Sequence, residues 1–201
     1  TGEALDAVET IMCDQTFGAA GETILIEEML EGQEVSVLAL VDGQTVWVLD
    51  PCQDHKQVGE GDVGPNTGGM GAYSPAPVVT DSVHDKVMAQ VILPTVRGMA
   101  AEGHAYTGFL YAGLMIDSDG NPAVIEYNCR FGDPETQPIM HRLKGDLGAL
   151  CLAALDGRLD EVSADWDPRP AVGVVLAAEG YPGSYEKGHE IQGLNTEWPA
   201  T

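Results

Sequence analysis

The spacing of apolar and polar residues along the chain predicts a mixture of helices and strands. Apolar side chains recur at helical spacing over residues 2–12, and a continuous apolar run over 23–28 predicts a buried strand. Two runs rich in β-branched residues flank the dipeptide Asp42-Gly43, which predicts a hairpin with a two-residue connection. The first part of the chain is therefore expected to contain a helix, a strand and a hairpin.

The next segment has little periodicity. Residues 54–77 are rich in Gly, Pro, Asn and Asp, which predicts a long loop, and structureless loops of that length are usually functional. After it, apolar residues at helical spacing predict a helix over 80–101, with Thr80 as its N-cap. Pro94 is expected to kink this helix or to split it in two, because proline has no N–H to donate.

Further along, strand-like runs at 109–117 and 123–127 predict a second hairpin. A short helix is expected after Asp146, with Gly157 just beyond its last turn. Hairpins with helices packed on them predict an α+β fold with a largely antiparallel sheet.

The end of the chain predicts a change of domain. Residues 159–170 are acidic and contain prolines, so we expect a linker there. The strand-like run at 171–178 that follows has no later strand to pair with. Because the first residues already carry a helical pattern and no initiator Met precedes them, we expect the chain to be a fragment of a longer protein.

The net charge of the chain excludes some classes of binding partner. Lys and Arg number 9 against 32 Asp and Glu, a formal net charge of −23. A chain this acidic is not expected to bind nucleic acid or an anionic membrane, so any phosphate must be held by a few cations, metal ions or backbone N–H groups. No apolar run approaches the roughly 18 residues that span a membrane, and four scattered cysteines predict reduced thiols and a cytoplasmic location.

The first candidate site lies on the predicted strand at 123–127 and just beyond it. Glu126 and Asn128 are two residues apart, so they share a face, while Tyr127 points to the other side. A carboxylate beside a carboxamide provides the hard oxygen ligands that suit Mg²⁺, and Arg130 could hold phosphate oxygens. The alternative is a strand end whose polar side chains are simply solvated.

The second and third candidates lie in the predicted loop. Its segment 64–75 (GPNTGGMGAYSP) is rich in glycine and hydrogen-bonding side chains, so its backbone could approach a ligand; the alternative is a flexible turn. Asp54-His55-Lys56 precedes it, and Lys56 is one of only four lysines. A lysine in a functional loop can neutralise a transferring phosphoryl group, although a surface lysine is the alternative.

Taken in order, these segments resemble the phosphoribosylamine–glycine ligase family (glycinamide ribonucleotide synthetases) of the ATP-grasp superfamily. The resemblance runs over nearly the whole chain, and its two longest motifs, GPNTGGMGAYSP and NCRFGDPETQP, are highly specific. The residues that carry it are 26–34 (IEEMLEGQE), 53–56 (QDHK), 64–77, 106–115 (YTGFLYAGLM) and 124–141 (VIEYNCRFGDPETQPIMH).

The resemblance implies an ATP-dependent ligase of purine biosynthesis. ATP would phosphorylate the glycine carboxylate, and the amine of 5-phosphoribosylamine would attack the glycyl phosphate. The products would be glycinamide ribonucleotide, ADP and phosphate. Other readings stay open: a different ATP-grasp carboxylate–amine ligase, a non-catalytic nucleotide-binding module, or one part of a multifunctional purine enzyme. A monomer is also possible.

The resemblance also implies roles for single residues. Glu126 and Asn128 would hold Mg²⁺ or Mn²⁺, and Lys56 and Arg130 would act as catalytic residues near the phosphates or the acyl phosphate. For ATP, the backbone of Glu28 and Leu30 would meet the adenine and Glu34 the ribose hydroxyls. Binding of glycine or phosphoribosylamine would fall to Asp54, Gly68, Gly69, Met70 and Gly71.

The chain resembles only some of the domains that are typical of the family. Residues 1–28 resemble the end of the ATP-grasp lid subdomain, 29–160 the ATP-grasp core, and 168–201 the start of a β-rich C-terminal domain. The family's N-terminal domain and its glycine-rich lid, with a lysine for the ATP phosphates, have no counterpart in the chain. We therefore expect a partial ATP-grasp fold that is inactive alone.

Overall fold

The computed structural model describes residues 2–197, which divide into two units, 2–30 and 31–197. The first unit begins with helix α1 (Gly2–Val8), which continues as the π-helical turn η1 (Glu9–Cys13). The helix expected over 2–12 is thus confirmed. Its apolar positions are not a buried stripe, however, because no residue of α1 or η1 is buried.

The buried strand expected over 23–28 is wrong. After the 3₁₀ helix η2 (Gly18–Glu22), the backbone is extended but belongs to no strand, and Leu25 and Ile26 are each 81% exposed. A strand needs a neighbour for its N–H and C=O groups, and within residues 2–197 no segment pairs with this one.

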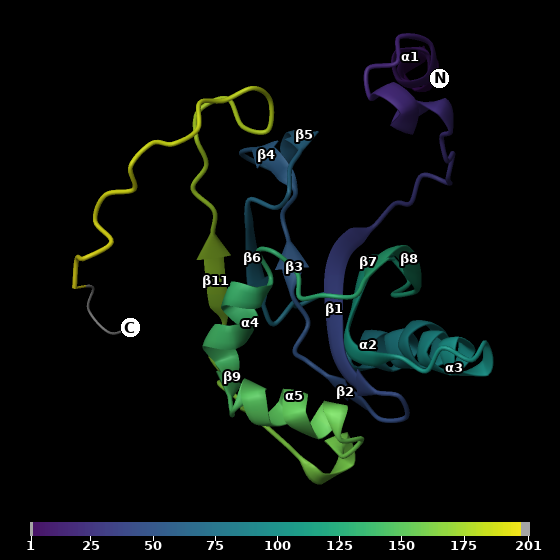
Figure 1. Ribbon diagram of the computed structural model, residues 1–201, viewed down its shortest axis with the longest axis vertical. Helices are drawn as coiled ribbons and strands as arrows, with labels where there is room; N and C mark the ends of the chain where they lie inside the picture. Colours follow the sequence, from purple (N-terminus) through teal and green to yellow (C-terminus); the bar gives the residue numbers. More distant parts are fainter. Residues whose placement is uncertain (1, 198–201) are drawn as a thin grey trace. The chain divides into compact units, whose positions relative to one another are not determined.

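The second unit is built on an antiparallel sheet whose strand order is β2-β1-β7-β8 (Figure 1). Both predicted hairpins are confirmed. In the first, Gly43 has a positive φ of 96° and the turn is centred on Gly43-Gln44, one residue later than expected. The strands are β1 (Gln33–Asp42), β2 (Val46–Val48), β7 (Thr107–Ile116) and β8 (Pro122–Asn128).

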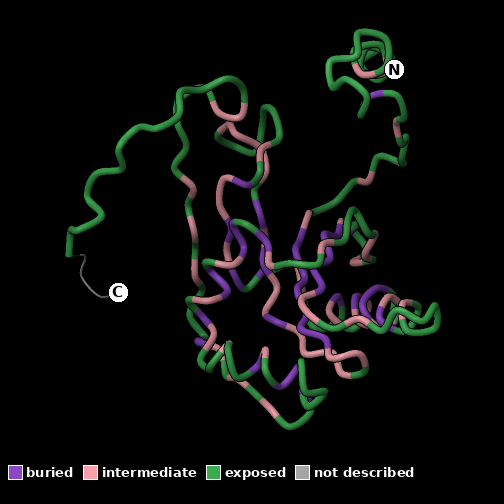
Figure 2. Tube along the Cα trace, in the orientation of Figure 1, coloured by how far each residue is buried: buried purple, intermediate pink, exposed green. Residues whose placement is uncertain are grey.

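One face of this sheet is covered by the predicted long helix (Figures 1 and 2). It runs as α2 (Asp81–Val87), the π-helical turn η3 (Met88–Ile92) and α3 (Leu93–Ala101). The Thr80 side chain caps it, as expected, by accepting a hydrogen bond from the N–H of Val83. Pro94 does not end the helix, because the wider turn η3 just before it absorbs the missing N–H.

The opposite face of the sheet carries two more helices. Leu38 and Leu40 of β1 point to this side, where they pack in clusters with residues of α4 (Thr136–Arg142) and α5 (Leu147–Leu155). Helix α5 follows its predicted Asp146 cap and ends before Gly157, whose φ is +68°. Helix α4 was not predicted. Strand β1 is buried on both faces, so it forms the centre of the unit (Figure 2).

Half of the long loop expected over 54–77 is regular structure. It contains β4 (Gln57–Gly59), β5 (Val63–Asn66) and β6 (Gly71–Ser74), and begins at the end of β3 (Gln53–Asp54). Each strand is only two to four residues long. Strands this short leave no detectable alternation of apolar and polar residues, so they appear only once their partners are in place.

The linker expected over 159–170 is also replaced by packed structure. Leu159 opens the 3₁₀ helix η4 (Leu159–Glu161) and is 2% exposed. Beyond it, β10 (Asp165–Trp166) pairs with β9 (Leu143–Lys144), and Trp166 stacks on Trp47 with ring centroids 6.1 Å apart. Composition suggested a linker because Asp160, Glu161 and Asp165 are exposed, whereas Leu159 and Asp167 are buried.

The strand expected over 171–178 is shorter than expected, and it pairs with a strand that precedes it in the sequence. Strand β11 (Ala171–Val174) lies antiparallel to β6, in a sheet of order β11-β6-β3. Its partner is therefore an earlier strand, which the sequence reading had overlooked. Residues 175–197 contain no strand.

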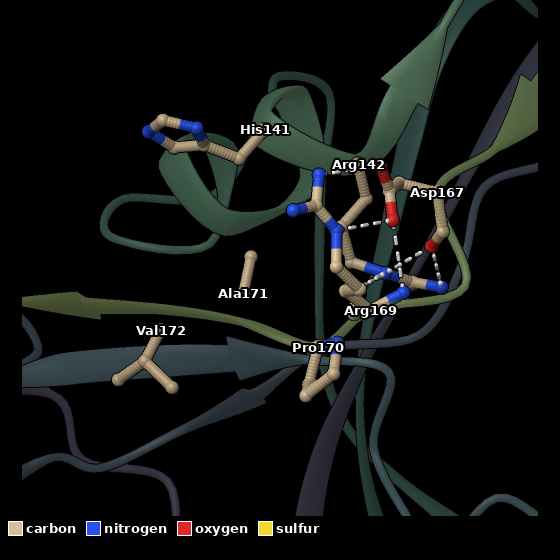
Figure 3. A pocket seen from close by; sticks show the side chains of 7 residues that line it. All are labelled: His141, Arg142, Asp167, Arg169, Pro170, Ala171 and Val172. Carbon is tan, nitrogen blue, oxygen red and sulfur yellow. Dashed lines mark hydrogen bonds and ion pairs between the residues drawn. The ribbon is translucent and has the colours of Figure 1, made fainter. Parts of the chain in front are cut away.

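Arg142 ties these later elements together around a cavity of about 330 Å³ (Figure 3). Its guanidinium is 5% exposed and donates to the Asp50 carboxylate, to Ser74 Oγ and to the carbonyls of Asp167 and Arg169. Helix α4 is thereby fixed to β6 and to the segment between β10 and β11. In residues 2–197 no helix is both long and apolar enough to cross a membrane.

Candidate active site

A small polar cavity of about 60 Å³ brings together half of the predicted site residues. They come from the end of β3, the turn after it, the glycine-rich segment, strand β8 and the loop that precedes α4. Segments distant in sequence thus converge on one point. The lining residues are Asp54, Lys56, Gly68, Tyr111, Glu126, Asn128, Arg130, Gly132, Asp133 and Glu135.

Strand β8 presents Glu126 and Asn128 to this cavity, as their spacing predicted. Tyr127 points to the helical side of the sheet, where its hydroxyl lies 2.8 Å from Thr95 Oγ1. The strand has an irregular register between the pairs Gly113–Glu126 and Leu114–Val124, which leaves Ile125 as an extra residue. Such a bulge re-aims the residues that follow it.

Lys56 is surrounded by carboxylates. Its Nζ is paired with Glu34 Oε1 and lies 3.7 Å from Glu126 Oε1. Burial disfavours the charged ammonium, but the hydrogen bond and charge of Glu34, with Glu126 and Asp54, outweigh it and raise the pKa of Lys56. Lys56 is therefore a fixed positive charge beside the expected metal ligand Glu126.

Glu34, which was expected to meet the ribose hydroxyls, is paired with Lys56. Glu28 and Leu30 lie in the first unit, 2–30. The adenine and ribose contacts of all three residues stay predictions.

Arg130 lines the same cavity with its side chain exposed, as a phosphate-holding role would require. Its Nη1 donates to the carbonyl of Phe131 at 2.8 Å. The remaining guanidinium donors are directed by that single bond and can meet an anion bidentately.

The glycine-rich segment 64–75 contributes residues to two neighbouring cavities. Gly68 lines the cavity, and Gly69 has a φ of +118° with a hypothetical Cβ only 2.3 Å from Pro134 Cδ. Only glycine therefore allows this close approach to the loop before α4. Met70 and Gly71, also expected to bind substrate, line a neighbouring cavity of about 430 Å³ with His55 and residues of β11, and their role in substrate binding stays a prediction.

Glu135 is a site residue that the sequence reasoning missed. Its carboxylate is 2% exposed, and its Oε1 lies 2.7 Å from Ser36 Oγ and 3.0 Å from Tyr111 Oη. Those hydroxyls come from β1 and β7, so the burial of Glu135 depends on distant residues. A carboxylate inside the specific NCRFGDPETQP motif was the available signal.

The oxygen donors at the cavity fit a divalent metal ion. Glu126 and Asn128 supply the hard oxygen ligands at this cavity. The described part of the chain gathers no group of three His, Cys, Asp or Glu residues as a metal cage. Two protein ligands, with water and phosphate oxygens, are the usual shell of Mg²⁺ beside a nucleotide.

The comparison with protein families decides the relationship. A family model described as the phosphoribosylglycinamide synthetase ATP-grasp (A) domain matches residues 1–136, which is more than half of the chain. The chain belongs to this family. Membership of the phosphoribosylglycinamide synthetase family confirms the resemblance seen in the sequence and the ATP-grasp fold expected from it.

Curated relatives of the phosphoribosylglycinamide synthetase family agree. Proteins named phosphoribosylamine–glycine ligase from Vibrio cholerae and Salmonella typhimurium are each 64% identical over 195 residues, covering 97% of this chain and 46% of each relative. The chain thus spans about half the length of the curated relatives it matches.

Solved structures show the same fold. The crystal structure of a phosphoribosylamine–glycine ligase from Thermotoga maritima has a TM-score of 0.70 at 41% identity, over 81% of this chain and 40% of that one. An L-amino acid ligase from Bacillus licheniformis has a TM-score of 0.52 at 19% identity, over 76% of this chain and 36% of that one. The second likeness concerns the fold alone.

Proposed function

We propose that this chain forms part of the catalytic centre of an ATP-dependent ligase that joins glycine to 5-phosphoribosylamine. The reaction proceeds through glycyl phosphate and yields glycinamide ribonucleotide, ADP and phosphate. The observation that carries the proposal is the convergence of Glu126, Asn128, Lys56 and Arg130 on one cavity in a chain 64% identical to proteins named for this activity.

The chain's own residues support the chemistry by position and charge. Phosphoryl transfer requires charge neutralisation and alignment more than a nucleophilic side chain. Glu126 and Asn128 would hold Mg²⁺ or Mn²⁺, which when bound neutralises phosphate charge. Lys56 and Arg130 provide fixed cations on the same cavity, and the close approach at Gly69 keeps the glycine-rich segment against Pro134.

Substrate choice provides the test, because other ATP-grasp ligases share the fold. It is made on the full-length form, meaning the protein continued to the length of its curated relatives. With ATP and phosphoribosylamine, glycine should give glycinamide ribonucleotide and ADP in equal amounts by mass spectrometry. Formate, bicarbonate and alanine should give neither product above background. Turnover with another acid instead of glycine would replace this proposal by a different carboxylate–amine ligase.

A further inference from the structure

Asp54 is a buried carboxyl group with an unused oxygen at the cavity. The residue is 7% exposed, lies at the end of β3 and lines the cavity together with Gly68, Glu126 and Asn128. No hydrogen-bond donor among the described residues reaches its Oδ1. Since buried polar atoms are nearly always bonded, an orphaned carboxylate oxygen at a cavity indicates a ligand or a proton.

The groups around Asp54 set the charge it can carry. Burial is the largest influence and raises its pKa, the Glu135 and Glu34 carboxylates raise it further, and Lys56 opposes them, so the pKa of Asp54 is about 7. The other charged groups on the cavity are Glu126, Arg130 and Asp133. Asp54 can thus exchange a proton near neutral pH, where a general base works best.

The other carboxylates on the cavity, and Glu34 beside it, are already engaged or solvated. Glu135 Oε1 has two hydroxyl neighbours, Glu34 is paired with Lys56, and Glu126 is the expected metal ligand. Asp133 is exposed. His55 faces the neighbouring cavity, where its ring lies 5.5 Å from that of Tyr73. Among these groups, Asp54 alone combines burial with an unbonded oxygen.

We propose that Asp54 is the general base that removes a proton from the amine as it attacks the acyl phosphate. The inference rests on the proposed function. The nitrogen lone pair forms the new C–N bond, an N–H bond breaks with its proton going to the Asp54 carboxylate, and the C–O bond to phosphate breaks with its electron pair leaving on phosphate. Asp54 then returns the proton to solvent.

The test compares two nucleophiles in the full-length form of the Asp54→Asn variant. Hydroxylamine attacks acyl phosphates without needing a strong base, so it reports glycyl phosphate formation as a hydroxamate. With phosphoribosylamine, the variant should lose about 100-fold or more in kcat, within the usual contribution of a general base. Hydroxamate formation should stay within about threefold of wild type, which also shows that the variant is folded.

The pH dependence provides a second readout. Wild-type amide formation should rise with pH through about 7, the pKa of Asp54, and then level off. The Asp54→Asn variant should lack this inflection. Asp119→Asn is the matched control, because Asp119 is an exposed residue in the turn between β7 and β8, and its profile should be that of wild type.

Three results would overturn the inference. Equal losses with both nucleophiles, with a raised KM for glycine, would show that Asp54 holds glycine. An unchanged pH inflection in Asp54→Asn would show that another group takes the proton. A wild-type protein that forms neither amide nor hydroxamate from glycine would overturn the proposed function as well, which separates the two failures.

Discussion

The charge at the cavity is determined by a few individual side chains that pair with one another. Lys56 lies between Glu34 and Glu126, so the loss of either carboxylate changes what the ammonium can pair with. In the surrounding chain of net charge −23, a polyanionic nucleotide needs such placed cations and a metal ion to bind. Single substitutions at this point therefore separate metal binding from folding.

The Glu126→Gln variant of the full-length form should lose metal-dependent turnover by about 100-fold or more, since even residues behind metal ligands cost 10–100-fold. Glutamine keeps the shape of the side chain but removes the charge that attracts the metal. Steady-state rates titrated with Mg²⁺ and Mn²⁺ measure this. Glu161→Gln, at an exposed ion pair with Arg158, is the control and should leave the rate unchanged. Activity of Glu126→Gln at the wild-type level would exclude its role as a ligand.

Asp54 should also lower stability as the pH rises. Its pKa is about 7 in the folded chain against an ordinary value of 3.8 for an aspartate carboxyl, so the folded state binds the proton more tightly. Stability should therefore fall between pH 4 and 7 and then level off.

Urea unfolding of wild type and Asp54→Asn across that range measures the difference. The variant should become the more stable of the two as the pH rises through 7, because it removes a buried charge. If the free energy of unfolding of the two proteins changed with pH in the same way, that result would contradict the burial of Asp54 at the cavity.

At the scale of elements, Arg142 connects α4 to β6 and to the segment after β10. The Arg142→Ala variant should lose about 3–5 kcal/mol of unfolding free energy, because Asp50, Ser74 and two buried carbonyls lose their donor. The control Arg158→Ala removes an exposed ion pair with Asp156 and should leave the unfolding free energy nearly unchanged, because exposed ion pairs contribute little to stability. Chemical denaturation measures both, and similar losses would refute the linking role of Arg142.

The elements that could be predicted from sequence are those with local causes. Thr80 and Asp146 cap helices through bonds three residues ahead, and both hairpins close over a few residues. The pairing of β11 with β6 joins residues about a hundred positions apart, and nothing in either short strand specifies its partner. The apolar run at 23–28 had strand composition without a partner in the described chain.

The residues of the candidate site also divide into those that local sequence predicts and those whose placement depends on distant residues. Glu126 and Asn128 could be predicted to share one face, because side chains two residues apart on a strand point to the same side. Lys56 could be chosen because lysine is scarce in this chain and this lysine lies in the predicted loop. Glu135 could not be found this way, because its burial depends on Ser36 and Tyr111 from β1 and β7. Met70 and Gly71 follow Gly69 directly, yet strand β6 begins at Gly71 and carries them to the neighbouring cavity.

For the whole molecule, one measurement is the most direct: ADP release by the full-length form, with glycine and phosphoribosylamine omitted in turn. A ligase that activates glycine for attack by phosphoribosylamine should release ADP at its full rate only when both are present. Omission of either substrate should reduce the rate to background. Full release without glycine, or none with both substrates present, would contradict the proposed function.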